Sequence, residues 1–163
     1  MKIENFEIGN SQVFIIAELS ANHNGCIKTA IETIRAAKRA GADCIKLQTY
    51  TADTITIDSD NDDFVLKGTI WDGKALYDLY NEAYTPWQWH SELFKVAHEE
   101  GLICFSSPFD KTAVDFLEKF NVPAYKIASF EITDIPLIEY IASKGKPVII
   151  STGIAEEEDI ELA

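Results

Sequence analysis

Lys126 lies in the stretch AYKIASFE (residues 124–131), whose apolar side chains predict a short buried strand. A buried charge without a partner costs several kcal/mol, so this lysine must either reach water or meet an anion. The chain has a net charge of −13, so a general attraction for polyanions does not account for a lysine kept inside. We therefore expect Lys126 to serve one local anion.

Polar residues recur near the ends of the other strand-like runs. They are Glu18, Lys46, Gln48, Ser106, Ser107, Ser129, Glu131, Ser151 and Thr152. Lys46 and Gln48 are two residues apart, so in a strand both side chains leave the same face. In parallel α/β folds the carboxyl ends of the strands meet at one edge, where ligands bind. We expect these side chains to lie together there.

The chemistry of this set predicts the kind of ligand. Two ammonium groups with several hydroxyls can hold a phosphate or a carboxylate, while two carboxylates can transfer protons. Each serine taken alone could instead cap the helix that follows its strand. The set as a whole predicts a binding site for a small anion.

An alternation of strands and helices must position these residues. The apolar runs predict strands at 13–19, 44–49, 103–107, 124–129 and 147–152. Helices are predicted at 26–41, at 85–101, from Asp110, between Pro136 and Gly145, and over 155–163. The first helix shows its apolar face in Ile27, Ala30, Ile31, Ile34 and Ala37. Thr85 is the predicted N-cap of the second helix.

This alternation predicts parallel βα units joined by right-handed crossovers. A doubly wound sheet and a (β/α)8 barrel both fit it. The interval between the second and third strands is longer than the others and carries an insertion from about Thr51 to Thr85. The insertion is polar at first and aromatic later, which predicts a structured loop.

Composition and missing motifs exclude several classes of protein. Without a basic stripe, this acidic chain is not expected to bind nucleic acid or anionic membranes. Its longest apolar run, VFIIA, is far too short to span a membrane, and the start MKIENFEIGN shows no secretion signal, so we expect a cytoplasmic location. The motifs GxGxxG, GxxxxGK[ST] and GxSxG do not occur, which disfavours dinucleotide, P-loop and serine hydrolase sites.

The cysteines and histidines do not predict a metal site. Cys26, Cys44 and Cys104 lack CxxC spacing and are expected to be buried free thiols. The three histidines are too scattered along the chain for a ligand set. We expect His90 and His98, on the second helix, at solvent or interface positions.

Five motifs, IIAELSANHNG, GADCIKLQTY, FSSPFD, AYKIASFE and VIISTG, occur in an order and register that resemble the sialic acid synthase family over essentially the whole chain. ELSANH, KLQTYT and the insertion FVLKGTIWDGKALYDLYNEAYTPWQWH are most similar to its pseudaminic acid branch. The N-acetylneuraminate and legionaminate branches remain alternatives.

The resemblance implies a (β/α)8 TIM barrel, of which residues 1–163 would form about the first five βα units. The remaining strands and a C-terminal antifreeze-like domain would lie outside this chain. The implied reaction condenses phosphoenolpyruvate with an open-chain acetamido sugar to give a nonulosonic acid and phosphate. The implied enzyme is a homodimer that uses a divalent metal, usually manganese, held by histidines of later strands. No metal ligand is therefore assigned here.

The resemblance also implies roles for individual residues. Lys46 and Lys126 would bind phosphoenolpyruvate, and Glu18 would handle the proton of the attacking water or of a sugar hydroxyl. We expect Glu18 to avoid a salt bridge with either lysine and to have a raised proton affinity. The other implied site residues are Glu131 near the reacting carbons, Ser107, Ser129 and Ser151 as hydroxyl donors, Gln48 beside them, and Asn22 and His23 facing the sugar.

Two other classes stay open. A Schiff-base aldolase would use Lys126 as its nucleophile, and a non-catalytic interaction domain would use an acidic face and the aromatic segment 71–84. Residues 1–163 by themselves are expected to be inactive. They are also expected to self-associate, because the strands at 13–19 and 147–152 would leave backbone groups unpaired.

Overall fold

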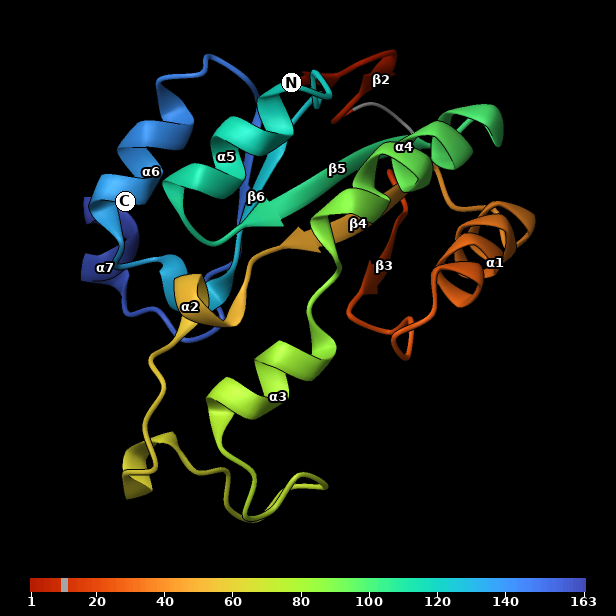
Figure 1. The fold of residues 1–163 in the computed structure, drawn as a ribbon. Coiled ribbons are helices and arrows are strands. Elements are labelled where there is room, and N and C mark those ends of the chain that lie inside the picture. The colour runs from red at the N-terminus through yellow and green to blue at the C-terminus, as the bar shows by residue number, and fades with distance from the viewer. Residues whose placement is uncertain (10–11) are drawn as a thin grey trace.

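A computed structural model of the chain, in which residues 1–9 and 12–163 are described, contains a five-stranded parallel sheet with helices packed against it (Figure 1). The sheet strands are β3 (Ile16–Ser20), β4 (Cys44–Thr49), β5 (Ile103–Pro108), β6 (Tyr125–Ile127) and β7 (Val148–Ile150). The helices that follow them are α1 (Ile27–Arg39), α4 (His90–Glu99), α5 (Lys111–Glu118), α6 (Ile135–Ala142) and α7 (Glu157–Leu162). None of the described helices is long and apolar enough to cross a membrane.

The strand order distinguishes the two architectures that the sequence left open. The strands are hydrogen-bonded in the order β3-β4-β5-β6-β7, so each lies beside the next one in the chain. A doubly wound sheet reverses its strand order at a switch point, whereas the strands of a barrel follow one another. The predicted barrel-type order is therefore confirmed. Right-handed crossovers in a sheet of this order place the helices on one face.

Local sequence accounts for where several helices begin and what they bury. Ala30 and Ile34 of α1 are fully buried, and the other apolar residues of that face pack against the same core. Asp110 caps α5 as predicted, because its carboxylate accepts hydrogen bonds from the backbone N–H groups of Thr112 (2.8 Å) and Ala113 (3.2 Å). Pro136 lies in the first turn of α6, which Asp134 caps in the same way.

The second predicted helix differs from expectation. A 3₁₀ turn, Trp87–Trp89, comes first, and α4 begins at His90. Thr85 is buried and its hydroxyl bonds to other parts of the chain, so its prediction as an N-cap is wrong. His90 is fully buried, so the prediction of a solvent or interface position is also wrong for it, while His98 is exposed as predicted.

Two segments cover opposite ends of the sheet. A short hairpin, β1 (Lys2–Ile3) and β2 (Phe6–Glu7), places Ile3 in the core and lies near the start of β4 and β5 (Figure 1). The insertion folds into α2 (Ala52–Ile55), a 3₁₀ turn (Asp62–Phe64) and α3 (Leu76–Ala83), beyond the carboxyl ends of the strands (Figure 1). The expected structured loop is confirmed.

The cysteines are free thiols, as predicted. Cys44 and Cys104 are buried in the sheet, but Cys26 is exposed just before α1, so the prediction of burial is wrong for that residue.

Candidate active site

The two faces of the sheet differ at its carboxyl end. Side chains alternate along β4 and β5, so Gln48 and Ser107, which are register partners, lie on one face, while Thr49 and Ser106 lie on the other. Thr49 is hydrogen-bonded to His90 of α4, so the second face carries the helices. We call the opposite face, with Gln48 and Ser107, the inner face.

Lys46 is on the inner face and is only 5% exposed. Its register partner on the adjacent strand β3 is Glu18, and the Lys46 Nζ atom lies 3.5 Å from the Glu18 Oε1 atom. The expectation that Glu18 avoids a salt bridge with either lysine is therefore wrong for this structure. Glu18 is otherwise exposed, so the ion pair has one buried partner and one that faces solvent.

Lys126 follows Tyr125, whose side chain is on the helix face, and so points to the inner face. It is partly buried, and its Nζ atom donates to the backbone carbonyl of Ile127 at 2.6 Å. Burial lowers the pKa of Lys126, and the nearby charge of Lys46 lowers it further. Among the described residues Lys126 forms no ion pair. An anion placed near these two ammonium groups would relieve their mutual repulsion.

Glu131 ends the 3₁₀ turn Ser129–Glu131 that follows β6. Its side chain is buried, and its Oε2 atom has no hydrogen-bond partner among the described residues. Burial raises the pKa of Glu131 to about 7; the charge of Asp134 acts in the same direction and Lys126 acts against it. At neutral pH the protonated and the ionised form of this carboxyl are therefore both populated, which suits proton transfer.

The three predicted serines lie at or just after the ends of β5, β6 and β7. Ser107 is buried on the inner face. The Ser129 hydroxyl accepts a hydrogen bond from the backbone N–H of Ile154 at 3.0 Å, which ties the segment after β7 to the end of β6. Ser151 is partly buried, and its backbone N–H donates to the backbone carbonyl of Ile127 at 3.1 Å.

Hydrogen bonds among three buried side chains on the helix face link the ends of β4 and β5 to α4. The Nε2 atom of His90 lies 2.9 Å from the Thr49 hydroxyl, which lies 2.7 Å from the Ser106 hydroxyl. Burial lowers the pKa of His90 to about 4, so its ring is neutral at pH 7. The expectation that Ser106 lies with Gln48 and the lysines is therefore wrong, because neighbouring strand residues point to opposite faces and Ser106 is on the face of Thr49. The hydrogen bonds among these three side chains were not predicted from the sequence.

A cavity of about 710 Å³ lies between the loop after β3 and helix α3. Its volume is within the range of about 300–1,000 Å³ common for small-molecule sites. It is lined by Ser20, Ala21, Asn22, Asn24, Gly25, Gln48, Tyr50, Trp71, Leu79, Tyr80, Glu82 and Ala83. Asn22 and Gln48 therefore line a cavity large enough for a sugar.

The structure does not place His23 in this cavity. The side chain is buried, its Nδ1 atom accepts from the Gly25 N–H at 3.2 Å, and its Nε2 atom lies 3.2 Å from the Thr85 hydroxyl. The first bond fixes the tautomer, because Nδ1 must be unprotonated to accept. Nε2–H therefore donates to Thr85. Burial also lowers the pKa of His23, so both ring nitrogens of a neutral imidazole hold the loop in place.

The described residues do not fit a metal ion. No group of three or more His, Cys, Asp and Glu side chains within 1–9 and 12–163 is arranged to hold one.

A sheet of consecutive parallel strands with helices packed on one face defines a barrel-type α/β domain. Comparison with known proteins gives the family. The chain belongs to the NeuB family, whose model matches residues 33–163. The family resemblance of its motifs is thereby confirmed.

Curated relatives and solved structures agree with this assignment. The chain is 54% identical to the pseudaminic acid synthase of Campylobacter jejuni over 98% of its own length, and 50% identical to that of Helicobacter pylori over 90%. It spans 46% and 43% of those proteins, less than half of each. A crystal structure of N-acetylneuraminic acid synthetase from Leptospira borgpetersenii, in complex with citrate, matches 99% of this chain and 52% of that one, with a TM-score of 0.84 and 30% identity.

Proposed function

We propose that the protein carrying this chain condenses phosphoenolpyruvate with an open-chain acetamido sugar, forming a nonulosonic acid and releasing phosphate. The observation that carries the proposal is the pair of lysines, Lys46 and Lys126, on the inner face at the carboxyl end of the sheet. The similarity to pseudaminic acid synthases supports pseudaminic acid as the product.

Phosphoenolpyruvate carries a phosphate and a carboxylate, which match two ammonium groups in charge. Lys46 and Lys126 bind these groups, with hydroxyls from Ser107, Ser129 and Ser151 as further donors. In the structure Glu18 pairs with Lys46. The anion competes for that lysine, so its binding frees the Glu18 carboxylate next to the reacting atoms.

The bond changes follow from the substrate. The methylene carbon of phosphoenolpyruvate attacks the aldehyde carbon of the sugar, and the aldehyde oxygen takes up a proton. Water adds to the resulting cation at the second carbon, and phosphate leaves as its bond to that carbon breaks. Glu131, with a pKa of about 7, supplies the proton to the aldehyde oxygen, and Glu18 accepts the proton of the water.

The sugar occupies the cavity beside these groups. Asn22 and Gln48 line it and offer amide groups to hydroxyls and acetamido groups. The proposal for the intact protein also includes a divalent metal, a homodimeric assembly and a cytoplasmic location, all of which rest on the family resemblance. It further treats residues 1–163 as the N-terminal part of the synthase barrel.

The test uses the intact protein and phosphoenolpyruvate labelled with ¹⁸O at the bridging oxygen. Incubation with the acetamido sugar accepted by pseudaminic acid synthases should release phosphate that contains the label, since the carbon–oxygen bond breaks. Mass spectrometry of the second product should show a nonulosonic acid without the label. Unlabelled phosphate, or no condensation product with any acetamido sugar, would contradict the proposal.

The lowered pKa of Lys126 favours a second candidate, a Schiff-base aldolase, because a neutral amine is the nucleophile in that chemistry. The two candidates differ in covalent chemistry. Borohydride reduction in the presence of pyruvate would attach pyruvate to Lys126 in an aldolase, whereas the synthase leaves the lysine unmodified. Peptide mass spectrometry over residues 124–131 separates them.

A further inference from the structure

Helix α3 of the insertion forms one wall of the cavity. Leu79, Tyr80, Ala83 and the carboxylate of Glu82, which pairs with Lys74, line it from α3, and Trp71 lines it from the segment just before. The facing wall is the loop after β3, with Ser20, Asn22 and Asn24, and Gln48 lies between the walls at the end of β4. The cavity therefore has a mainly apolar wall and a wall rich in amide and hydroxyl groups.

These two walls suit different parts of an acetamido sugar. Amide and hydroxyl side chains can bond to the hydroxyl, N–H and carbonyl groups of the substrate. Aromatic and aliphatic side chains bind C–H surfaces and the acetamido methyl group favourably, because burying these apolar groups breaks no hydrogen bonds to water. An open sugar chain lying between the walls would have its apolar surface against α3.

Ring contacts join Tyr80 of this wall to the segment after β6. Its ring packs edge-on against Tyr50 at a centroid distance of 5.7 Å, and Tyr50 packs edge-on against Phe109 at 5.3 Å. Burial raises the pKa of Tyr80, and the charge of Glu131 raises it further, so the Glu131 carboxyl is within electrostatic range of the phenol. Phe109 in turn packs against Phe130 at a centroid distance of 5.9 Å, and Phe130 directly precedes Glu131 in the chain. Ring contacts therefore connect Tyr80 in the cavity wall to the segment that carries the carboxyl assigned to the aldehyde oxygen.

Two hydrogen bonds hold this wall in place. The Tyr77 hydroxyl donates to the Asp53 carboxylate at 2.9 Å, which joins α3 to α2. Trp87, beyond the other end of α3, donates from its indole N–H to the Tyr50 carbonyl at 3.1 Å. The insertion is therefore fastened at two points to segments that follow β4, and Tyr80 lies between them in sequence.

We infer that Tyr80 is a specificity-determining residue of the sugar site, whose ring supports the acetamido sugar and directs its aldehyde carbon towards Glu131. This inference rests on the proposed function. It assigns the role of the aromatic insertion, which the phosphoenolpyruvate-binding lysines do not explain.

The test is a set of variants of the intact protein, assayed by phosphate release with each substrate varied in turn. Tyr80→Ala should raise the KM for the sugar at least about tenfold, which corresponds to about 1.4 kcal/mol, and should leave the KM for phosphoenolpyruvate within about twofold. Tyr80→Phe keeps the ring and should restore the sugar KM to within about threefold of wild type. Asn81→Ala, an exposed position on the same helix that does not line the cavity, is the matched control and should leave both constants unchanged.

A second position keeps the test decisive if Tyr80→Ala fails to fold by circular dichroism. Trp71 lines the same wall and is 48% exposed, so Trp71→Ala should fold and should also raise the sugar KM selectively. An unchanged sugar KM in Tyr80→Ala, or in Trp71→Ala if the first variant does not fold, would overturn the inference. An equal rise in both constants would do the same. Absence of wild-type turnover with any acetamido sugar would instead refute the proposed function itself.

Discussion

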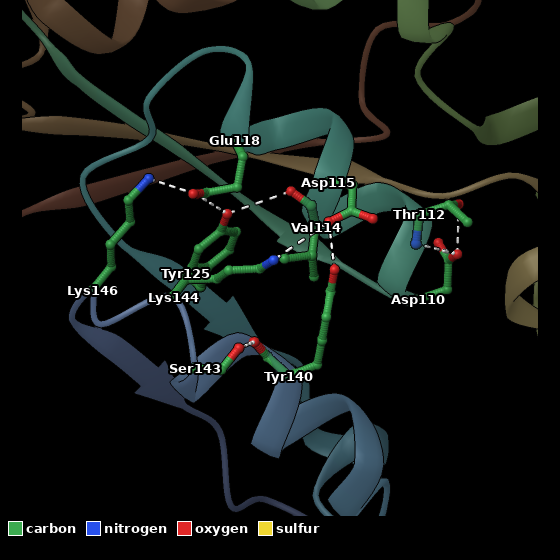
Figure 2. Close-up of polar contacts among 10 residues, drawn as sticks. All are labelled: Asp110, Thr112, Val114, Asp115, Glu118, Tyr125, Tyr140, Ser143, Lys144 and Lys146. Carbon is green, nitrogen blue, oxygen red and sulfur yellow. Dashed lines mark hydrogen bonds and ion pairs between the residues drawn. The ribbon is translucent and has the colours of Figure 1, made fainter.

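Two groups of charged residues in this protein differ in how their charges are paired. The inner site consists of Glu18, Lys46, Lys126 and Glu131. The outer network joins α5, β6, α6 and the start of β7 through Asp115, Glu118, Tyr125, Tyr140, Lys144 and Lys146 (Figure 2). Both groups contain lysines and carboxylates, but they differ in how fully their polar atoms are paired.

In the outer network each charge has a fixed partner. Figure 2 shows the Glu118 carboxylate between Lys146 and the Tyr125 hydroxyl, which donates to it at 2.6 Å. Partial burial would raise the pKa of Glu118, but the hydrogen bonds from Lys146 and Tyr125 outweigh it and lower the pKa. The Tyr140 hydroxyl holds the pKa of Asp115 down in the same way. Such carboxylates stay ionised and keep helices and strands together.

In the inner site the pairing is incomplete. Glu131 has an oxygen without a partner among the described residues and a raised pKa, and Lys126 has a lowered pKa and a carbonyl as its bonded acceptor. Both shifts have burial as their largest cause, so the fold disfavours the charged form of each group at some cost in stability. The difference indicates that the outer network serves the fold, whereas the inner site serves a ligand.

The largest effect is expected from Glu18→Gln, which keeps the shape of the side chain and removes its ability to take a proton. Turnover in the intact protein should fall by about 10²–10⁴-fold, the usual contribution of a general base. The KM for phosphoenolpyruvate should not rise, because the variant no longer competes with the anion for Lys46. Assays of phosphate release at varied phosphoenolpyruvate concentration measure turnover and this KM. Glu139→Gln, an exposed carboxylate on α6, is the control and should behave as wild type. Near-wild-type turnover of Glu18→Gln would remove Glu18 from the mechanism.

Removing either lysine should weaken the binding of phosphoenolpyruvate at the inner site. Lys46→Ala and Lys126→Ala are each expected to raise the KM for phosphoenolpyruvate by about 10–100-fold, since a charge-assisted hydrogen bond contributes about 1.5–3 kcal/mol. The KM for the sugar should change far less.

The matched control for these variants is Lys144→Ala in the outer network, which should leave both Michaelis constants unchanged. Equal weakening of the two substrates by Lys46→Ala or Lys126→Ala would contradict the anion-binding role.

Glu131 offers a test by pH. Its pKa is about 7 in the folded protein and about 4.5 when unfolded, so the folded state binds the proton more tightly. Stability contributed by the protonated carboxyl is present below pH 4.5 and is lost as the pH rises through 7. Glu131→Gln should therefore be more stable than wild type at pH 8, by up to about 3 kcal/mol at 1.36 kcal/mol per pKa unit. The difference should vanish near pH 4.

Urea unfolding of both proteins across this pH range measures the effect. A difference between Glu131→Gln and wild type that is independent of pH would show that the carboxyl is not held in its protonated form by burial.

The smallest effect is expected in the outer network. Tyr125→Phe removes the hydroxyl shared between Glu118 and the Val114 carbonyl, and should lower the free energy of unfolding by about 1–2 kcal/mol without altering either Michaelis constant. Thermal unfolding and the phosphate-release assay together check this. A changed KM for phosphoenolpyruvate would mean that the two groups of charges are coupled through β6, where Tyr125 and Lys126 are neighbours.

Much of the fold was predictable because its signals are local. The apolar runs at 44–49 and 103–107 gave β4 and β5 nearly residue for residue, and Asp110 gave the start of α5. Predictions failed where a side chain bonds to a distant part of the chain. Thr85 would be a reasonable N-cap, but its hydroxyl is used by His23, 62 residues away. His90 looked like a surface residue, but Thr49, 41 residues away, pairs with its ring in the interior.

The same division holds for the site. The sequence by itself determined which residues reach the carboxyl end of the sheet and which of them share a face, because strand alternation has a fixed period of two. The shared face of Lys46 and Gln48 follows from that rule, whereas Ser107 and Lys126 were placed on it by the strand register and the packing of Tyr125. Tertiary structure alone decided that Glu18 meets Lys46, that Glu131 is buried with a raised pKa, and that His23 faces away from the cavity. These properties depend on desolvation and on distances between separate elements, which arise only when the helices and the insertion pack against the sheet.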